Sequence, residues 1–378
     1  MRNPVKQIES IMYGEKNSLL APFLSVLSNA YCGIIRIREN LYEKGVLKSE
    51  KLPCAVISVG NITVGGTGKT PMTIYIAELI KGFGLNVAVV SRGYKGKAEK
   101  TGGIVSDGKK LYMNAAAAGD EPCMIAERLK GIPVIIGQNR FRSGSTAVKR
   151  FNPDVIILDD AFQHLQLQRD INLVLLDNDL PFGNACLLPR GTLREPLSAL
   201  RRCDAFVLTR ADCGQNSLPG ELKKLVPQRP VFRSSHVPYL NRVVTSKRSG
   251  SGREPQIKDS LKLNILRDKK LFLFSGIADN RAFYNSIHAI EQNIKGFLRF
   301  HDHYIYNQDD INKITQSALK SKADYIVTTE KDYARLDRKT TWPLDLAVAG
   351  VEISFGKDEE AFNIFIKRKL ALSGIENL

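Results

Sequence analysis

Short runs of apolar residues alternate with stretches of helical periodicity along most of the chain. Runs rich in Val, Ile and Leu predict buried strands over residues 54–60, 86–93, 133–137, 154–160, 171–177 and 204–210. Helical patterns lie between several of them, as at residues 70–82 and 119–130. Because strands buried on both faces carry continuous apolar runs and need crossover connections, the alternation predicts a mainly parallel sheet with helices on both of its faces.

The same kind of alternation returns after a loop without periodicity. Residues 246–255, SKRSGSGREP, are rich in Gly, Ser and charged residues, as loops are. Beyond them the pattern predicts strands over residues 270–278, 324–332 and 344–355, and helices from about residue 280, near 308–320 and over 358–371. The chain therefore divides into two α/β units.

Before the first strand, residues 19–35 form an apolar stretch that Pro22 and several polar residues interrupt. At about 17 residues it is short for a membrane-spanning helix. Apolar residues recur at helical spacing at Leu20, Phe23, Leu24, Leu27 and Tyr31. Basic residues flank the stretch at Lys6, Lys16, Arg36, Arg38, Lys44 and Lys48. An apolar face between basic flanks is typical of a helix in an anionic membrane interface, and a helix packed on the core gives the same pattern.

Composition adds a strong basic excess to this picture. The 378 residues carry a formal net charge of +16, which predicts an anionic partner such as nucleic acid, a membrane surface or a phosphorylated substrate. Aromatic residues do not pair with basic runs in a single-strand-binding pattern, so nucleic-acid binding has no support. Six cysteines without C-x-x-C spacing argue against a zinc site or a disulfide framework and fit a reducing cytoplasm. The start, MRNPVKQIES, predicts no signal peptide.

Residues 57–80, ISVGNITVGGTGKTPMTIYIAELI, hold a glycine-rich turn between a predicted strand and a predicted helix. The spacing departs from G-x-x-x-x-G-K-[ST], because Thr63 stands where the first glycine belongs. The context is still the one in which backbone N–H groups and a helix N-terminus bind a triphosphate. Lys69 would then reach the β- and γ-phosphates, and the Thr70 hydroxyl would bind Mg²⁺. We predict nucleotide contacts from Thr63, Val64, Gly65, Gly66, Thr67, Gly68, Lys69 and Thr70.

Two other interpretations of this turn stay open. A glycine-rich turn can carry a Lys-Thr pair by chance. The GGTGKT core is also similar to that of partition-type ATPases, which would bind a protein partner at the membrane and which carry a signature lysine just before the paired glycines. Val64 occupies that position here, which favours a kinase over an ATPase that switches by dimerising.

A second landmark is DVIILDDAFQHLQLQRD, residues 154–170, in which a predicted strand ends at Asp159 and Asp160. Carboxylates at the C-terminal end of a strand beside a P-loop are where the metal–nucleotide complex binds in such sheets. Aspartate pairs also follow strands by chance, but the combination with the glycine-rich turn favours a metal site.

Seven motifs follow one another along the chain: SVGNITVGGTGKTP (58–71), VVSRGY (89–94), AGDEP (118–122), DDAFQH (159–164), LLPRGTLREP (187–196), HDHY (301–304) and TEKD (329–332). With these motifs the chain resembles the tetraacyldisaccharide 4'-kinase family, the lipid A 4'-kinases of Gram-negative bacteria, over almost its whole length. The odd spacing of the glycine-rich turn belongs to the family pattern.

The resemblance implies transfer of the γ-phosphate of ATP, with Mg²⁺, to the 4'-hydroxyl of a tetraacylated glucosamine disaccharide 1-phosphate. This glycolipid sits in the inner membrane and faces the cytoplasm. We therefore expect the protein at the cytoplasmic face of that membrane, held peripherally or monotopically on its anionic surface by the amino-terminal helix. No nucleic acid and no protein partner is implied.

The resemblance also assigns a candidate base. A sugar hydroxyl is a poor nucleophile at neutral pH, and Asp120 in AGDEP matches the family's general base. An aspartate before Glu-Pro is equally a good helix N-cap. His303 in HDHY matches the partner that would orient the carboxylate, and His301 in the same motif is the alternative.

Further roles follow from the same match. The candidate metal ligands are, in order, Thr70, Asp160, Asp159 and Glu195. Arg194 in LREP would offset charge that develops on the phosphoryl oxygens, with a surface salt bridge as its alternative. Gln163 and His164 follow the aspartate pair and are expected to line the site. TEKD is expected to shape the second unit and is given no chemistry.

The fold that the resemblance implies has two α/β sandwiches joined by a two-stranded linker, the first P-loop NTPase-like and the second smaller. The active site would lie in the cleft between them, with His303 contributed by the second. Two linker strands mean two crossings, so the final helix should return to the first unit. The expected parts are a helical membrane-associating region (1–36), a P-loop kinase domain (37–207), a second domain with the linker strands (208–355) and the returning helix (356–378).

Overall fold

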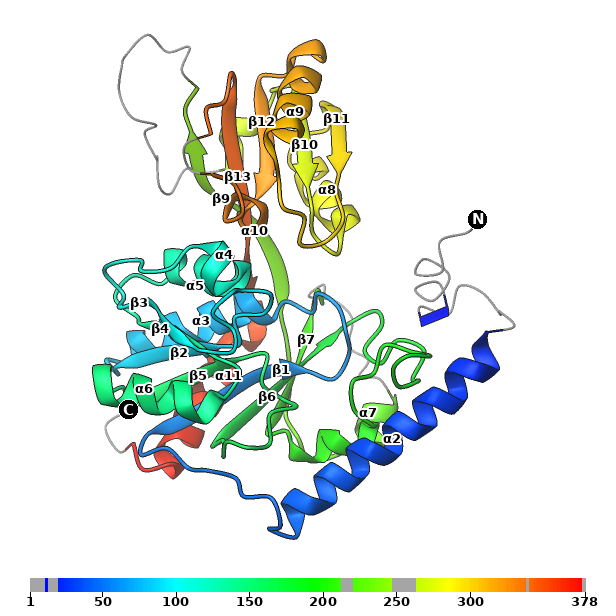
Figure 1. Ribbon diagram of the computed structural model, residues 1–378, viewed down its shortest axis with the longest axis vertical. Coiled ribbons are helices and arrows are strands. Elements are labelled where there is room, and N and C mark those ends of the chain that lie inside the picture. Colours follow the sequence, from blue (N-terminus) through cyan, green and yellow to red (C-terminus); the bar gives the residue numbers. More distant parts are fainter. Residues whose placement is uncertain (1–10, 13–19, 212–219, 247–262, 338–339, 376–378) are drawn as a thin grey trace.

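A computed structural model describes residues 11–12, 20–211, 220–246, 263–337 and 340–375. Over these residues the chain forms an eight-stranded sheet and a five-stranded sheet, and Figure 1 shows the smaller unit standing above the larger one. The mainly parallel α/β architecture predicted from the sequence is therefore confirmed. Lys6, Lys16 and most of the 246–255 loop lie outside the described residues.

The larger sheet is parallel except at one edge. Its spatial order is β3-β4-β2-β5-β1-β6-β7-β8, and β3 runs antiparallel to β4. Its strands are β1 (Ala55–Asn61), β2 (Val87–Ser91), β3 (Gly103–Ser106), β4 (Val134–Ile136), β5 (Val155–Asp159), β6 (Ile171–Asp177), β7 (Ala205–Thr209) and β8 (Val231–Arg233). All six runs predicted as strands are strands of this sheet, and the short β3 and β8 join it at its edges.

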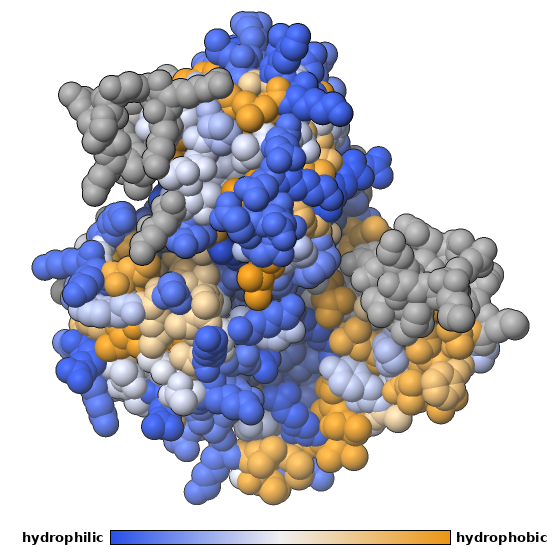
Figure 2. Space-filling model, turned by 45° about the horizontal axis from the view of Figure 1, so that its top comes forward, coloured by the Kyte–Doolittle hydropathy of each residue, from blue (hydrophilic) through white to orange (hydrophobic). Residues whose placement is uncertain are grey.

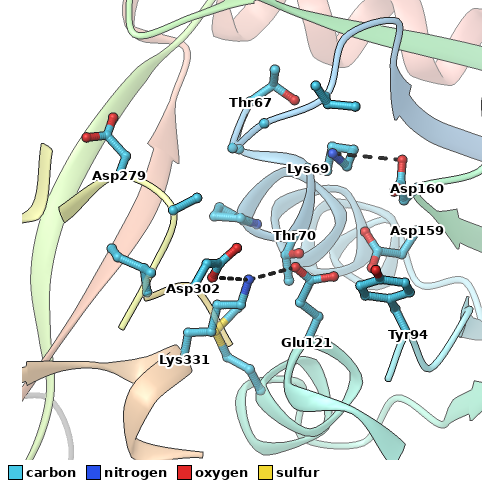
Figure 3. Close-up of a pocket in the computed structure, with 18 of the residues that line it drawn as sticks. Thr67, Lys69, Thr70, Tyr94, Glu121, Asp159, Asp160, Asp279, Asp302 and Lys331 are labelled. Carbon is cyan, nitrogen blue, oxygen red and sulfur yellow. Dashed lines mark hydrogen bonds and ion pairs between the residues drawn. The ribbon is translucent and has the colours of Figure 1, made fainter. Parts of the chain in front are cut away.

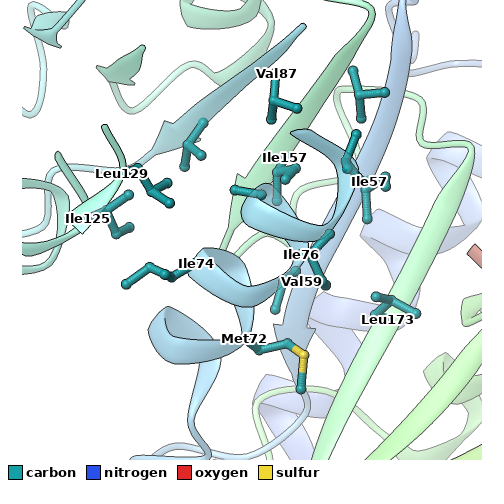
Figure 4. Packing of buried hydrophobic residues seen from close by; sticks show 14 of the residues in the cluster. Ile57, Val59, Met72, Ile74, Ile76, Val87, Ile125, Leu129, Ile157 and Leu173 are labelled. Atoms are coloured by element: carbon teal, nitrogen blue, oxygen red, sulfur yellow. The ribbon is translucent and has the colours of Figure 1, made fainter. Parts of the chain in front are cut away.

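Helices cover both faces of this sheet because alternate side chains of a strand point to opposite sides. The helical segments are α3 (Lys69–Gly82), α4 (Ala115–Ala118), α5 (Asp120–Arg128), α6 (Arg140–Phe151), η1 (Leu197–Arg202), α7 (Gly220–Leu225) and α11 (Glu359–Leu372). Ile57 and Val59 belong to the buried cluster that includes α3 and α5, drawn in Figure 4. Val56 and Leu158 belong to a second cluster, on the α6 side.

The smaller sheet has the order β11-β10-β12-β13-β9, with β9 antiparallel to β13 and the other pairs parallel. Its strands are β9 (Ser235–Val244), β10 (Leu271–Ser275), β11 (Ile294–Arg299), β12 (Tyr325–Thr329) and β13 (Asp345–Ser354). Its helices are η2 (Leu263–Leu266), α8 (Asn280–His288), α9 (Gln308–Lys320) and α10 (Glu330–Tyr333). The strand predicted over 324–332 ends at Thr329, and its last residues begin α10.

Two long strands join the units. β9 follows β8 and pairs with β13, which leads through η3 (Gly356–Asp358) into α11. Phe362 and Ile366 of α11 are buried in the same cluster as the strands of the larger sheet, so the chain crosses between the units twice (Figure 1). The larger sheet extends to Arg233 of β8, past residue 207, where we placed the boundary.

α2 (Ala21–Glu43) lies along one side of the larger unit (Figure 1) and has two different faces. Its buried residues are Leu24, Ser28 and Ile35. Its exposed apolar residues are Phe23, Val26, Leu27, Ile34 and Ile37, and the exposed Leu20 comes just before it. Figure 2 shows apolar side chains gathered on this side of the molecule. The helix therefore packs on the protein through one face and leaves another uncovered. Within the described parts of the chain, no helix is long and apolar enough to cross a membrane.

Candidate active site

A cavity of about 1660 Å³ lies between the two units. The turns that follow β1, β2 and β5 line it from the larger unit, at the C-terminal ends of parallel strands, where open α/β sheets bind ligands. The smaller unit contributes Ile277, Asp302, His303 and Lys331. Figure 3 shows side chains from both units pointing into this space.

The glycine-rich turn ends where α3 begins. Gly68 is the N-cap of α3 and has a φ of 80°, a left-handed conformation that glycine adopts without strain. A Cβ at this position would lie 2.5 Å from Nε2 of His236 in β9, so no side chain fits. The N–H groups of the first turn of α3 have no intrahelical partner and are available to a phosphate.

The segment that precedes Arg194 holds the turn in place. The Val64 N–H donates to the carbonyl of Thr192 over 2.7 Å, and Thr63 forms an antiparallel bridge with Leu193. Thr63 is consequently buried and does not line the cavity. The other predicted nucleotide contacts all line it, namely Val64, Gly65, Gly66, Thr67, Gly68, Lys69 and Thr70.

Asp159 and Asp160 end β5 beside this turn. The buried carboxylate of Asp159 accepts hydrogen bonds from the hydroxyls of Thr73 and Ser91, both over 3.1 Å. Asp160 Oδ1 lies 3.8 Å from Lys69 Nζ, drawn as a dashed line in Figure 3. Burial alone would raise the pKa of Asp160, but nearby cations, led by Lys69, outweigh burial and lower it. Asp160 therefore carries negative charge next to the glycine-rich turn.

The same residues fit a divalent cation. Thr70, Asp159 and Asp160 all line the cavity. Burial raises the pKa of Asp159, and the carboxylates of Glu121 and Asp160 raise it further, so a bound cation would relieve the cost of ionising it. Among the described residues, no group of three or more His, Cys, Asp and Glu side chains could hold an ion by itself. A cation bound here would therefore need further oxygen ligands besides these carboxylates.

Arg194 belongs to the cavity and not to an unrelated surface. Its Nη1 donates to both carboxylate oxygens of Asp160, over 2.8 and 3.1 Å, and to Gln163 Oε1 over 3.3 Å. Gln163 and His164 line the same space. Burial, with neighbouring arginines, lowers the pKa of His164 to about 4, so its ring is neutral at pH 7.

Glu195 is placed differently from the other three candidate metal ligands. Its carboxylate is buried and accepts a hydrogen bond from Arg202 Nη2 over 2.5 Å, and Arg202 also pairs with Glu39 of α2. Glu195 is not among the residues that line the cavity. The expectation that it binds the metal is therefore corrected: its contacts tie the LREP segment to α2.

Asp120 and His303 meet although 183 positions separate them in the chain, and Nδ1 of His303 lies 2.9 Å from Oδ2 of Asp120. Asp120 opens α5 in the larger unit, whereas His303 lies in the loop after β11 in the smaller one. His303 lines the cavity, and Asp120 lies behind it. A hydrogen bond to a carboxylate needs a proton on Nδ1, and Nε2, the other ring nitrogen, lies 3.6 Å from Oδ2 of Asp302.

The helix-cap interpretation of Asp120 is wrong. Gly119 is the N-cap of α5, Asp120 is the first helical residue, and no side chain caps this helix. His301 is exposed, and its Nδ1 lies 3.0 Å from the carbonyl oxygen of Asp302. His303, and not His301, is therefore the partner of Asp120.

Four charged residues at the junction of the units were not singled out from the sequence, namely Glu121, Asp302, Lys331 and Arg335. Lys331 Nζ lies 3.1 Å from Glu121 Oε1 and 3.9 Å from Asp302 Oδ1, as Figure 3 shows. Arg335 Nε donates to Asp120 Oδ2 over 2.6 Å. Glu121 and Lys331 fall within AGDEP and TEKD, so those motifs were the available signal. Arg335 lies beyond TEKD, so no motif drew attention to it.

The fold and the site together define a class. A helix N-terminus and a lysine suit phosphate groups, aspartates at a strand end suit a metal–nucleotide complex, and an Asp–His pair suits a hydroxyl that must lose its proton. Phosphoryl transfer to a hydroxyl needs these parts and little other covalent chemistry from the protein. The chain is thus a kinase built on a P-loop fold.

Comparison with known proteins narrows this class to one family. Residues 20–371 match the family described as tetraacyldisaccharide-1-P 4'-kinase. The tetraacyldisaccharide 4'-kinase of Desulfatibacillum aliphaticivorans is 41% identical over 97% of this chain and 98% of its own length. That of Desulfotalea psychrophila is 38% identical over 91% and 97%. The crystal structure of the "apo" form of LpxK from Aquifex aeolicus in complex with ATP has a TM-score of 0.71 and 32% identity, and covers 93% of this chain and 100% of that one.

The chain belongs to the tetraacyldisaccharide-1-P 4'-kinase family. It is an ATP-dependent kinase of lipid A biosynthesis, and its acceptor is the glycolipid tetraacyldisaccharide 1-phosphate, phosphorylated at the 4' position. The kinase prediction is confirmed, and the alternative of a partition-type ATPase is set aside.

Proposed function

We propose that the two units build a single phosphoryl-transfer site in which Asp120 and His303 activate the acceptor hydroxyl. The observation that carries this proposal is the 2.9 Å contact between the two side chains, one from each unit. His303 borders the same cavity as Lys69 and the glycine-rich turn. A hydroxyl placed against this pair would therefore lie in the compartment that also takes the nucleotide.

On the donor side, residues 64–70 bind the phosphates of ATP. Lys69 neutralises charge on the transferring group, and Arg194, held by Asp160 at 2.8 Å, adds a second positive charge beside it. Thr70, Asp159 and Asp160 would hold Mg²⁺, which when bound would offset negative charge on the phosphate groups. Asp159 is kept in place by its two hydroxyl donors, so this carboxylate needs no rearrangement to bind.

On the acceptor side, Asp120 takes the proton of the 4'-hydroxyl while His303 orients the carboxylate through Nδ1. The oxygen then forms a bond to the γ-phosphorus as the bond to ADP breaks. Burial would raise the pKa of Asp120, but the hydrogen bond from His303 and the charge of Arg335 lower it, so the carboxylate is ionised at neutral pH. Its position in the first turn of α5 favours the same charge state.

The acceptor's acyl chains place this reaction at a membrane surface. α2 offers an uncovered apolar face to it, with Phe23 62% exposed, and the formal charge of +16 attracts anionic head groups. In this proposal the enzyme works at the cytoplasmic face of the inner membrane, bound through α2, and needs no protein partner.

Labelled ATP and a tetraacyldisaccharide 1-phosphate test the assignment. The unaltered enzyme should form a bis-phosphorylated lipid and release ADP only when the acceptor is present. Asp120→Asn should bind ATP normally and form product at least about 10²-fold more slowly, because the general base is lost. Product formation near the unaltered rate in Asp120→Asn would remove Asp120 from the chemistry.

A further inference from the structure

Arg335 is a second side chain of the smaller unit that binds Asp120. Its Nε donates to Asp120 Oδ2 over 2.6 Å, and its Nη1 donates to the carbonyl of Gly276 over 2.7 Å. The side chain of Arg335 is 4% exposed and does not line the cavity. Arg335 therefore contacts the proposed base from the protein side, where no substrate can reach it.

Asp332 holds this guanidinium in position. Its Oδ1 accepts from Arg335 Nη1 over 3.1 Å, from the Gly276 N–H over 3.0 Å and from the Tyr306 hydroxyl over 2.9 Å. Its Oδ2 accepts from the Thr329 hydroxyl over 2.7 Å, and the side chain is fully buried. A buried carboxylate with this many donors is tightly oriented, because each lost bond would leave a desolvated charge unpaired. The TEKD motif, which ends in Asp332, thus fixes the orientation of Arg335.

Both donors to Asp120 use the same carboxylate oxygen. Oδ2 accepts from His303 Nδ1 and from Arg335 Nε, and neither bond involves Oδ1. Two donors at different angles fix the plane of a carboxylate more firmly than one. Oδ1 accepts neither of these bonds, and the side chain of Asp120, although behind His303, is 15% exposed. We therefore assign Oδ1 to the acceptor hydroxyl.

We propose that Arg335 is a positioning residue for phosphoryl transfer: held by Asp332, it locks Oδ2 of Asp120 so that Oδ1 meets the acceptor hydroxyl. The inference rests on the proposed role of Asp120 as the base. The proposal gives the TEKD motif a function, because its Asp332 holds the Arg335 side chain, which reaches across the junction of the units to Asp120. The base is then correctly oriented only when the smaller unit is seated on α5.

The charged groups around Asp120 allow the proposed role of Arg335 to be tested through the pKa of Asp120. The groups that face it are His303 and Arg335 from the smaller unit, with Glu121 beside it in α5 paired to Lys331. Of these, Arg335 is a permanent cation in direct contact, and it is among the groups that lower the pKa of Asp120. Removal of this cation should raise that pKa, so the rate should begin to fall at a higher pH when the solution is made more acidic.

The test compares Arg335→Met with Arg335→Lys and with a matched control. Arg242 is the control, because it also reaches from the smaller unit to α5, where its Nη2 lies 3.3 Å from Glu127 Oε2, without touching Asp120. Arg335→Met should lower kcat by about 10–10²-fold, as expected for a misplaced reacting group, with KM for ATP nearly unchanged. Its acid limb in the pH–kcat profile should move to higher pH. Arg335→Lys should recover most of the rate and keep the limb in place, since it retains the charge.

Two outcomes would overturn the inference: an Arg335→Met enzyme with kcat close to the unaltered value, or one whose slower rate has an unmoved acid limb. Arg242→Met must leave that limb where it is, because a shift there would show a general effect of loosening the junction. If Arg335→Met fails to fold, Arg335→Gln takes its place, because it removes the charge but keeps hydrogen-bond donors, and its acid limb should move to higher pH in the same way. In an Asp120→Ala background, Arg335→Met should add almost no further loss, because the two act as a unit. High activity of Asp120→Ala itself would instead reject the proposed base.

Discussion

Lys69 is the side chain whose loss most directly tests the nucleotide site. It begins α3, borders the cavity and lies 3.8 Å from Asp160. Lys69→Ala should lower kcat by about 10²–10³-fold, because a charge that meets the transferring phosphoryl group is removed. Lys81→Ala is the matched control: it lies near the end of the same helix, donates to the Lys130 carbonyl, and should keep its rate. Similar rates for the two variants, with unchanged circular dichroism, would contradict the assignment.

Asp120 and His303 should behave as one unit in a double-mutant cycle. Asp120→Ala and His303→Ala should each lower kcat by roughly 10²–10⁴-fold, the range of general-base catalysis. The double variant should be little slower than the slower single one, since residues that act together are strongly non-additive. ATP binding, followed by titration calorimetry, should survive in all three. Losses that multiply in the double variant would reject the pair.

Apolar runs made most of the larger sheet predictable, because strands buried on both faces have little choice of composition. β11 was not predicted, for the opposite reason. Ile294–Arg299 is only partly buried and carries charge at Lys295 and Arg299, so it shows no continuous run of apolar residues. α6 was missed as well, since its amphipathic pattern, RFRSGSTAVKRF, is mostly polar with glycine inside. The local sequence pattern therefore identifies the strands of the core. Partly buried or mostly polar elements can be located only from the three-dimensional fold.

The site divides along similar lines. The glycine-rich turn and the Asp159–Asp160 pair are local in sequence, so their motifs could be recognised from spacing and from the strands beside them. The contact of Asp120 with His303 joins two units, and only family resemblance made it predictable. No motif pointed to Arg335, because its role depends on where the chain places it just after α10. Glu195 was assigned wrongly to the metal, because the LREP motif contains both Arg194 and Glu195 but says nothing about the direction in which each side chain points.

α2 should bind membranes through its uncovered face while its other face supports the site. The Tyr31 hydroxyl donates to the carbonyl of Arg194 over 3.0 Å, and Arg38 donates to the carbonyl of Gln163 over 2.9 Å. Deletion of residues 1–36 would remove Tyr31 together with the apolar face, so it cannot separate the two roles. Substitutions confined to the uncovered face can separate them.

A double substitution, Phe23→Ser with Ile34→Ser, should weaken binding to anionic vesicles by at least about tenfold, because each large apolar side chain contributes about 1.5–3 kcal/mol when fully buried. The rate with detergent-dispersed acceptor should stay near that of the unaltered enzyme. Ile364→Ser with Leu372→Ser, on exposed positions of α11, is the control and should sediment with vesicles normally. Equal sedimentation of all three proteins would show that α2 does not contact the membrane.

The reacting groups come from both units, so the way the units hold together bears on catalysis. Apart from the two linker strands, a charged cluster joins them around Glu330 of α10. Glu330 pairs with Arg128 of α5 over 3.4 Å and accepts hydrogen bonds from Tyr239 and Asn241 of β9. Arg128 also reaches Glu352 of β13 over 3.2 Å. This cluster and the contacts of Asp120 occupy the two ends of the same short helix, α5.

Glu330 should make the stability of the molecule depend on pH in a predictable direction. Burial raises its pKa to about 7, and the nearby arginines only partly offset this. A carboxyl whose pKa is raised on folding stabilises the native state fully below its unfolded pKa, about 4.3, and this contribution is lost as pH rises through the folded value. Glu330→Gln is neutral at every pH, so it lacks this loss. The difference in Tm, variant minus unaltered protein, should therefore increase between about pH 4.5 and 7 and level off above.

Glu352→Gln is the matched control for this prediction, because Glu352 contacts the same Arg128 but is half exposed. Its difference in Tm should stay small and change little over the same range, as for most exposed ion pairs. A constant offset for Glu330→Gln at all pH values would mean that Glu330 is ionised throughout and acts only as a partner of Arg128. A difference in Tm that falls with pH would mean that the arginines outweigh burial. The expected rise would show instead that protonation of Glu330 stabilises the junction between the units. Asp120, the proposed base, lies at the other end of α5 from this junction cluster.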